Sequence, residues 1–470
     1  MTPKVWLLLS LLLLNWIDNP LNLNEMRRLV MWMLGVLMVA CNSTGQPVNG
    51  EKPLAFPGAE GAGKYTVGGR GGEVYVVTNL KDEGEGSLRK GVQKHGARTI
   101  VFAVSGTILL NRPMDINNDS ITIAGQTAPG DGICLQGYGL NIKANEVIVR
   151  YLRIRPGDIY EVEQDAVSTI GRKNIIIDHC SMSWGNDEVL SAYNIENLTV
   201  QWCLISESLN ESHHHKGEHG YGGIWGGHKA TFHHNLLAHH TSRNPRFQGG
   251  RSLKPGQEEL VEMVNNVIYN YAEKAAYAGE AGQYNMIANY FKPGPATSKS
   301  ERRYIIEPYA PLGKFYLNGN VVVGAPEVTE DNSLGINTKR GSLEEIVAQV
   351  PFSVSDYKVR GAEEAYEAVL TGVGASHKRD VIDQRVIAEV REGTATYGRN
   401  GILDSQEQVG GWPDLLSAEV PLDGDGDGMP DTWEEANGLN SKESYDHSAY
   451  DLSKHYTNLE VYMNSLVDLD

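Results

Sequence analysis

Short stretches of alternating apolar and polar residues recur along the middle of the chain, each ending at a small or polar residue. VIVRYL, IIIDHC, ATFHHN and VEMVNN are examples, and their period of two is typical of β-strands with one buried face. The end residues are Gln126, Leu152, Cys180, Cys203, Asn235, Asn266, Asn289 and Asn320. They recur at similar but unequal intervals, which indicates a solenoid with a fixed minimal coil and loops of variable length.

Three short strands per coil, with coils about 4.8 Å apart, would bury one continuous apolar core. The pattern therefore predicts an all-β fold, a parallel β-helix over residues 53–340. An antiparallel β-sandwich is the alternative, although a recurrent asparagine corner is not expected in one. Beyond residue 340 the spacing becomes helical in GSLEEIVAQV and AEEAYEAVL, so we expect residues 341–410 to form a helical segment packed on the solenoid.

The N-terminal region, residues 1–41, has the pattern of a targeting segment. The stretch MRRLVMWMLGVLMVAC begins at Met26 with two arginines, continues as an apolar run and ends at Cys41, which is the order of a secretory signal. It resembles a bacterial lipoprotein signal in which Cys41 carries the lipid, and an ordinary signal peptide is the alternative. We therefore expect an exported protein, either secreted or an outer-membrane lipoprotein that contacts the membrane only through its lipid anchor.

Net charge and cysteine content bear on the kind of partner and on the presence of disulfide bonds. The formal net charge of -18 over 470 residues argues against a nucleic acid partner, since a phosphate backbone is met by an excess of Lys and Arg. Four cysteines are too few for a disulfide framework. We expect Cys134, Cys180 and Cys203 to be buried free thiols.

The C-terminal tail, residues 421–470, contains the acidic run DGDGDGMPDTWE. Its oxygen-bearing positions have the 1, 3, 5, 7, 9, 12 spacing of an EF-hand-type calcium loop, with Gly428 at the sharp turn. The sequence therefore predicts a structural Ca²⁺ site, with a solvated acidic turn as the alternative, followed by a helix in YTNLEVYMNSL. The predicted ligands are Asp423, Asp425, Asp427, Met429, Asp431 and Glu434.

Opposite charges gather on consecutive predicted coils. Residues 158–196 are rich in acids, and residues 213–251 are rich in Lys, Arg and His. Because neighbouring coils stack, we expect both groups side by side on one lateral face, where a bound cation and fixed guanidinium groups would suit a polyanion of carboxylated sugars. Solvated strands with scattered ion pairs are the alternative. The run His213 to His215 lacks a zinc-ligand spacing and is more typical of a ladder or a sugar cleft.

Several long motifs, in order, resemble one known family. AFPGAEGAGKYTVGGRGGEVYVVTNLKDEGEGSLR, ITIAGQTAPGDGICL, NIIIDHCSMSWGNDEVLS and RNPRF are similar to polysaccharide lyase family 1, the pectate lyases, and most closely to bacterial pectate trisaccharide-lyases. The resemblance covers residues 53–325. It implies a right-handed parallel β-helix that cleaves de-esterified homogalacturonan by calcium-dependent β-elimination to 4,5-unsaturated oligogalacturonides. We expect the protein to act as a monomer on this acidic polysaccharide.

The resemblance also assigns roles to residues. Arg243, the first arginine of the RNPR motif, would be the base that removes the C5 proton, and Lys216 would hold the substrate carboxylate. Substrate binding would fall to Arg246, Arg251 and His215. Calcium would be held by Glu163, Asp165 and Asp187, and by Glu188, because Ser191 stands where the family usually has a further aspartate. Asp178 and His179 match a motif that we interpret as structural.

Three other functions remain open from the sequence. A pectin lyase would share the fold but would prefer methylated substrate and replace calcium with an arginine, which the acids Glu163, Asp165 and Asp187 disfavour. A polygalacturonase would hydrolyse the same polymer and needs clustered aspartates with neighbouring motifs that the sequence lacks. A non-catalytic pectin-binding solenoid is the third alternative, and the presence of Arg243 and Lys216 argues against it.

Overall fold

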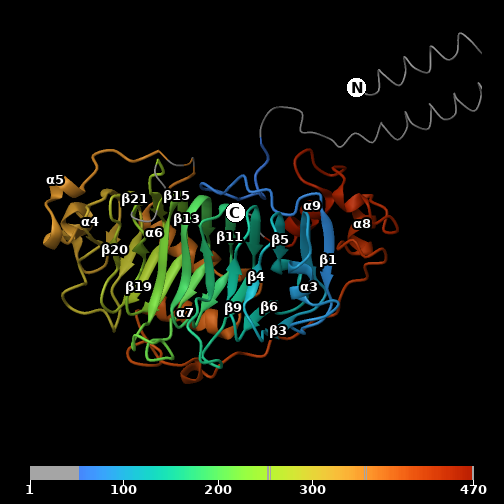
Figure 1. The fold of residues 1–470 in the computed structure, drawn as a ribbon, viewed down its shortest axis with the longest axis horizontal. Helices are drawn as coiled ribbons and strands as arrows, with labels where there is room; N and C mark the ends of the chain where they lie inside the picture. Colours follow the sequence, from blue (N-terminus) through green and yellow to red (C-terminus); the bar gives the residue numbers. More distant parts are fainter. Residues whose placement is uncertain (1–51, 251–252, 254–255, 354, 356, 468–470) are drawn as a thin grey trace, which may run out of the picture. The chain divides into compact units, whose positions relative to one another are not determined.

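Parallel β-strands stack into a solenoid in the computed structural model, which describes residues 52–467 except 251–252, 254–255, 354 and 356 (Figure 1). Residues Lys52–Asp470 form one compact unit. The expected signal segment, with its start at Met26 and its lipidation site Cys41, lies outside the described residues. No helix among the residues that are described is both long and apolar enough to cross a membrane.

The strands form three faces. The first face is, in order, β1 (Glu73–Val77), β2 (Arg98–Phe102), β5 (Ile121–Ala124), β8 (Val147–Arg150), β11 (Lys173–Asp178), β13 (Glu188–Gln201), β15 (Tyr221–His233), β18 (Leu260–Val264), β21 (Gln283–Ile287) and β24 (Lys314–Asn318). The second face is β3 (Gly106–Leu109), β6 (Ile133–Gln136), β9 (Leu152–Arg155), β12 (Ser181–Ser183), β14 (Leu204–Ser206), β16 (Leu236–His240), β19 (Val267–Tyr271), β22 (Tyr290–Lys292) and β25 (Val321–Val322).

The third face shares two long strands with the first. It consists of β4 (Met114–Ile116), β7 (Leu140–Ile142), β10 (Val167–Ile170), the starts of β13 and β15, β17 (Arg246–Phe247), β20 (Ala276–Ala278) and β23 (Ile306–Pro308). Strand β13 pairs with β10 through Leu190 and with β11 through Thr199, so it turns the corner between the two faces.

The strand register confirms the predicted parallel β-helix and excludes the sandwich. Thr122 pairs with Ile148 of the next coil, and all strand pairs between neighbouring coils of the first face are parallel. Further along the same face, Thr231 pairs with Glu262. Thr122 and Ile148 are as far apart along the chain as the predicted corner residues Gln126 and Leu152. Thr231 and Glu262 are as far apart as Asn235 and Asn266. The predicted lengths of these two coils are therefore confirmed.

Four of the predicted corner residues form a hydrogen-bonded ladder. The backbone N–H and the side-chain amide of Asn235 both donate to Oδ1 of Asn266, at 3.0 and 2.9 Å, and the same pair of bonds repeats from Asn266 to Asn289 and from Asn289 to Asn320. Asn332 accepts the last two bonds. All four corner asparagines are fully buried, so the ladder satisfies polar groups that would otherwise be stranded in the core.

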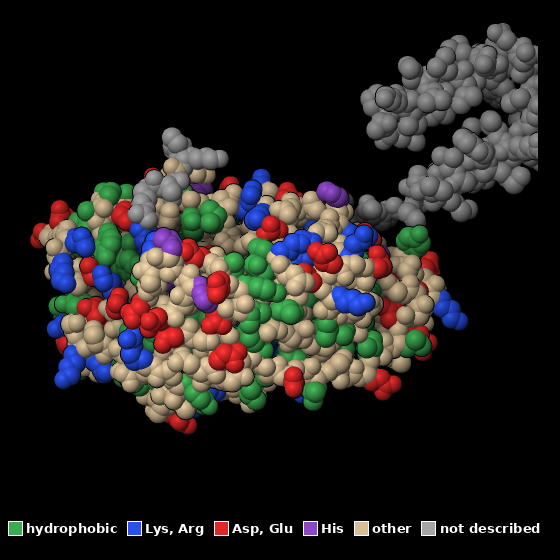
Figure 2. All heavy atoms as spheres, turned by 60° about the horizontal axis from the view of Figure 1, so that its bottom comes forward, with side chains coloured by type: hydrophobic (Ala, Val, Ile, Leu, Met, Phe, Trp, Pro, Cys, Tyr) green, Lys and Arg blue, Asp and Glu red, His purple; other side chains and the backbone are tan. Residues whose placement is uncertain are grey.

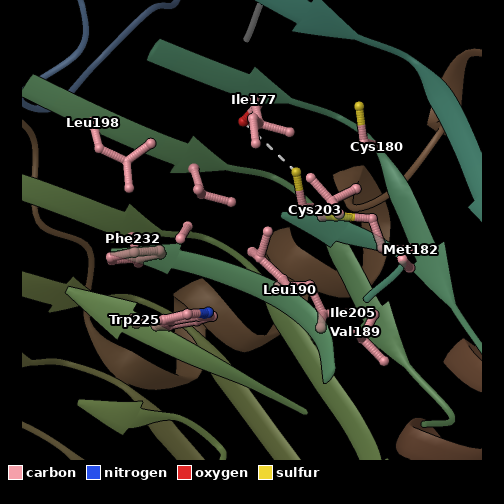
Figure 3. Packing of buried hydrophobic residues seen from close by; sticks show 14 of the residues in the cluster. Ile177, Cys180, Met182, Val189, Leu190, Leu198, Cys203, Ile205, Trp225 and Phe232 are labelled. Atoms are coloured by element: carbon pink, nitrogen blue, oxygen red, sulfur yellow. Dashed lines mark hydrogen bonds between the residues drawn. The ribbon is translucent and has the colours of Figure 1, made fainter. Parts of the chain in front are cut away.

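The interior is filled by stacked apolar side chains. Trp225 and Phe232 stack at 4.2 Å, and the thiol of Cys203 donates to the carbonyl of Ile177 at 3.7 Å (Figure 3). Cys134, Cys180 and Cys203 are buried free thiols, as predicted.

The predicted helical segment covers the second face and one end of the solenoid. Helices α6 (Ala362–Gly372) and α7 (Val381–Glu392) pack Val369 and Val386 against Leu236 and Val267. The helix expected in GSLEEIVAQV is only the short α5 (Leu343–Ile346), because Val347 forms a parallel bridge with Phe315 of β24 instead. Before the tail, the other helices of the described residues are α3 (Leu88–Val92), α4 (Pro326–Glu330), η1 (Gly125–Thr127), η3 (Asn332–Gly335), η4 (Thr338–Arg340), η5 (Ser376–Lys378) and η6 (Gln406–Val409).

The tail packs on the outer side of the first face, beside β1 and β2 (Figure 1). It contains α8 (Asp431–Asn437), η7 (Asp446–Ser448) and α9 (Asn458–Ser465). Helix α9 is the helix predicted after the acidic loop, and Thr457 and Glu460 form its capping box. Ile100 of β2 points into the core, whereas Val101 contacts the tail.

Candidate active site

The candidate active site is built by consecutive coils where the third face begins. Glu163 and Asp165 lie in the loop between β9 and β10. Asp187 lies directly before β13, and Glu188 is the first residue of that strand. The cations come from the next loops, Lys216 between β14 and β15 and Arg243 between β16 and β17. On the face in view, Figure 2 shows Lys and Arg side chains as separate patches among acidic and uncharged ones.

Three carboxylates converge in this site. Asp165, Asp187 and Glu188 each offer an oxygen within 4.8 Å of the others. The backbone N–H of Glu188 donates to Asp165 at 3.0 Å, and the Ser191 hydroxyl donates to Glu188 Oε2 at 3.2 Å. The family usually has an aspartate at the position of Ser191. In this chain the Ser191 hydroxyl instead holds the carboxylate of Glu188 in place.

The electrostatics of this cluster favour a cation. Burial raises the pKa of Asp165, and the nearby charge of Asp187 raises it further. Burial also disfavours ionisation of Asp187, but the hydrogen bond from His219 and the charges of His214 and Arg243 keep its pKa below the usual value. Ionising all three acids requires a positive charge between them, and carboxylate oxygens are the ligands that Ca²⁺ prefers.

Arg243 lies directly beside the acids. Its Nη1 contacts Glu188 Oε1, and its guanidinium carbon is 4.5 Å from the centroid of the Tyr221 ring. The Nε atom is buried and has no hydrogen-bond partner among the described residues. Arg243 thus has a fixed position beside the acids.

A stack of rings, which the sequence analysis did not foresee, supports the acids and Arg243. His214 stacks on His219 at 3.7 Å, and His219 lies 3.9 Å from Tyr221. Because His214 Nδ1 accepts from the backbone N–H of Lys216, a neutral His214 carries its proton on Nε2, which lies 3.4 Å from Asp187 Oδ1. The ring is therefore arranged to orient a carboxylate, and Asp187, His214 and His219 also offer ligand atoms within 4.8 Å of one another.

The other predicted residues have different surroundings. Glu163 accepts two hydrogen bonds from His215, whose side chain is 65% exposed, and the backbone bond from His215 lowers the pKa of Glu163. Arg246 is buried and bonds Glu280 at 3.0 Å and the Phe247 carbonyl at 2.9 Å, so its guanidinium points into the solenoid wall. Arg251 lies outside the described residues. The substrate-binding roles of His215, Arg246 and Arg251 stay predictions.

The acidic tail loop forms a second group of carboxylates. Asp423, Asp425 and Asp427 offer oxygens within 4.8 Å of one another, and Asp427 and Glu434 form another such group with Asp446, which the loop spacing does not include. Met429 buries its side chain in an apolar cluster, and its predicted ligand atom is the backbone carbonyl, so its role stays a prediction. Asp431 accepts from the backbone N–H of Gly424 at 2.6 Å.

Comparison with known proteins places the geometry in context. No protein-family model matches the chain. A probable pectate lyase C of Emericella nidulans is 37% identical over 422 residues, which cover 88% of this chain and 93% of the relative. A protein of the same name from Aspergillus flavus is 37% identical over 428 residues, covering 88% and 94%. The predicted similarity to bacterial trisaccharide-lyases stays a prediction, since these relatives are fungal.

Solved structures share the fold. The major allergen of cedar pollen has a TM-score of 0.50 at 20% identity, covering 67% of this chain and 92% of the allergen. A thermostable pectate lyase has a TM-score of 0.50 at 16% identity, covering 68% and 98%. These structures show the fold, and the sequence relatives show that this chain belongs to the pectate lyase family.

Proposed function

We propose that the chain cleaves de-esterified polygalacturonate by calcium-assisted β-elimination. The observation that carries the proposal is the cluster of Asp165, Asp187 and Glu188 in contact with Arg243. This arrangement provides a cation site and a fixed guanidinium on one surface, which is what a polymer of carboxylated sugars needs to approach an acidic protein. The names of the sequence relatives support the same activity.

The reaction breaks a C4–O glycosidic bond without water. In this proposal a neutral Arg243 guanidine accepts the proton from C5 of a galacturonate unit and becomes a guanidinium, the C5–H electron pair forms the C4=C5 double bond, and the C4 oxygen leaves and takes up a proton from solvent. Lys216 neutralises the carboxylate on C5, which acidifies the C5 proton. Bound calcium, held by Asp165, Asp187, Glu188 and Glu163, would add Lewis-acid stabilisation of that carboxylate. The products are 4,5-unsaturated oligogalacturonides.

The same acids argue against the alternatives. A methylated substrate carries no carboxylate charge, so a pectin lyase would gain nothing from three convergent acids around a cation site. Hydrolysis needs one carboxyl group as acid and another as base. Glu188 contacts Arg243 and is therefore not free to serve as either.

Two further parts of the proposal concern the tail and the N-terminus. We propose that the tail loop binds a second, structural Ca²⁺ through Asp425, Asp427 and Glu434. We also propose that the protein is exported through its N-terminal segment, and mass spectrometry of the mature N-terminus would distinguish lipidation at Cys41 from ordinary signal cleavage.

The decisive experiment follows the ultraviolet absorbance of the new conjugated double bond on polygalacturonate. We expect absorbance to rise with wild-type protein in calcium, to stop in EGTA, and to be lost in Arg243→Ala. Arg303→Ala removes an arginine whose side chain is 47% exposed and pairs loosely with Glu327, so it should retain full activity. Reducing ends without a rise in absorbance would indicate hydrolysis, and binding without either signal would indicate a non-catalytic solenoid.

A further inference from the structure

Six carboxylate oxygens in the tail are buried and have no hydrogen-bond partner among the described residues. They are both oxygens of Asp425, Oδ2 of Asp427, both oxygens of Glu434 and Oδ1 of Asp446. Glu434 is 0% exposed and Asp427 is 2% exposed. Buried carboxylates without partners are costly, so these oxygens call for a cation between them.

Asp446 is the member of this group that the loop spacing does not contain. It lies well beyond Glu434, at the first residue of η7, and its carboxylate is within 4.8 Å of ligand atoms of both Asp427 and Glu434. Its backbone carbonyl accepts from the Asn458 amide at 2.9 Å, and its Oδ2 accepts from the Asn440 N–H at 3.3 Å. These bonds hold Asp446 in position with Oδ1 directed toward the loop.

Hydrogen bonds inside the loop keep the other oxygens turned inward. Asp423 accepts from the backbone N–H groups of Gly426 at 2.8 Å and Gly428 at 3.0 Å, and Asp431 accepts from Gly424. Six free carboxylate oxygens fall within the roughly six to eight oxygen ligands that Ca²⁺ takes. The loop is therefore ordered by its own backbone, with its free carboxylate oxygens directed inward.

The loop also rests on the solenoid. Met429 is fully buried and packs in one cluster with Val101 of β2, Ala124 of β5 and Leu459 of α9. A side chain at Gly428 would come within 3.0 Å of Val74 of β1, so the loop backbone lies directly on the first face. The carboxylates are thus concentrated at the point where the tail contacts the first coils.

We propose that one calcium ion, held jointly by Asp425, Asp427 and Glu434 of the loop and by Asp446 of η7, fastens the tail onto the first face. This inference rests on the tail calcium site of the proposed function and is independent of the candidate active site. Without the ion, the crowded carboxylates would repel one another, which would loosen the tail from Val74 and Val101.

Terbium luminescence tests the ligand set. Trp433 precedes Glu434 and packs in the same apolar cluster as Met429, so it can sensitise Tb³⁺ bound in the loop. We expect calcium-displaceable emission in the wild type, and an affinity weakened at least about tenfold in Asp446→Asn, since ligand charge sets calcium affinity. Glu435→Gln removes an exposed acid from the same helix and should change nothing.

Each outcome decides for or against the proposal. Equal affinity in Asp446→Asn would remove Asp446 from the site. Emission that is absent in the wild type, or that keeps its affinity in both Asp446→Asn and Glu434→Gln, would show that the loop holds no ion. Circular dichroism checks that each variant folds, and Glu434→Gln supplies a second ligand variant should Asp446→Asn fail to fold.

Limited proteolysis tests whether calcium holds the tail on the first face. We expect EGTA to expose the tail to cleavage in the wild type, and Asp446→Asn to be cleaved readily even in calcium. The experiment is repeated in Asp187→Asn, which removes an acid of the candidate active site. This variant distinguishes loss of calcium at the active site from loss of calcium in the tail. A tail that resists protease equally with and without calcium would overturn the proposal.

Discussion

The guanidinium of Arg243 lies over the ring of Tyr221, with its central carbon 4.5 Å from the ring centroid. Tyr221 also contacts the ring of His219, so it has little freedom to move. A cation over an aromatic face is stabilised by about 0.5–2 kcal/mol. In the proposed mechanism Tyr221 would therefore act through the position of Arg243, without contact with substrate.

Replacing this ring tests its role as a support. We expect Tyr221→Leu to lower kcat about tenfold, which corresponds to about 1.4 kcal/mol, while KM changes little. Tyr221→Phe keeps the aromatic face and should retain most of kcat. Initial rates over a range of polygalacturonate concentrations separate the two constants. Equal losses in the Leu and Phe variants would assign the role to the hydroxyl group.

Glu188 contacts Arg243 and belongs to the acid cluster, so its replacement should affect calcium use. We expect Glu188→Gln to raise the free calcium concentration needed for half-maximal rate by about tenfold, because ligand charge sets calcium affinity. Rates in calcium buffers measure this directly. Glu196→Gln changes an exposed acid on the same strand and is the matched control. An unchanged calcium requirement in Glu188→Gln would exclude Glu188 as a ligand.

The solenoid was predictable because its signal repeats. Asn235, Asn266, Asn289 and Asn320 recur at coil spacing, and the structure joins them in one ladder. The ladder's last acceptor, Asn332, follows Asn320 too closely to fit the coil spacing, so it was missed.

The candidate site was predictable only in part. Charge clustering and resemblance identified Arg243 and the acids, but the supporting rings depend on a loop conformation that no local pattern encodes. His214 and Tyr221 are brought together by the turn between β14 and β15, and Asp446 joins the tail loop through tertiary packing. Sequence patterns therefore identify ligands at fixed spacing and miss those that come from other segments.

The asparagine ladder should contribute strongly to stability and not to chemistry. We expect Asn266→Ala to reduce the free energy of unfolding by about 2–4 kcal/mol, since it removes several buried hydrogen bonds and leaves their partners unsatisfied. Chemical denaturation measures the change, and specific activity at low temperature should remain close to wild type. Asn318→Ala, at the exposed end of β24, is the control. A loss below about 1 kcal/mol would mean that water replaces the amide.

Glu259 makes stability depend on pH. Burial raises its pKa to about 7, against hydrogen bonds from Gly249, Gly227 and Tyr284 that favour ionisation. Because the folded state holds this proton more tightly than the unfolded state, the stabilisation is present at low pH. It is lost as pH rises from about 4.5 through 7, by up to about 3 kcal/mol.

We therefore expect Glu259→Gln, which cannot titrate, to flatten the decline of the unfolding midpoint between about pH 5 and pH 8, the range that contains the raised pKa of about 7. Its absolute stability is not the test, because the amide changes the hydrogen bonds to Gly227 and Gly249. Thermal unfolding at saturating calcium keeps the metal sites ionised throughout. Glu258→Gln alters the exposed neighbour and should keep the wild-type slope. If Glu259→Gln kept that slope as well, the pH dependence would have to come from other buried acids.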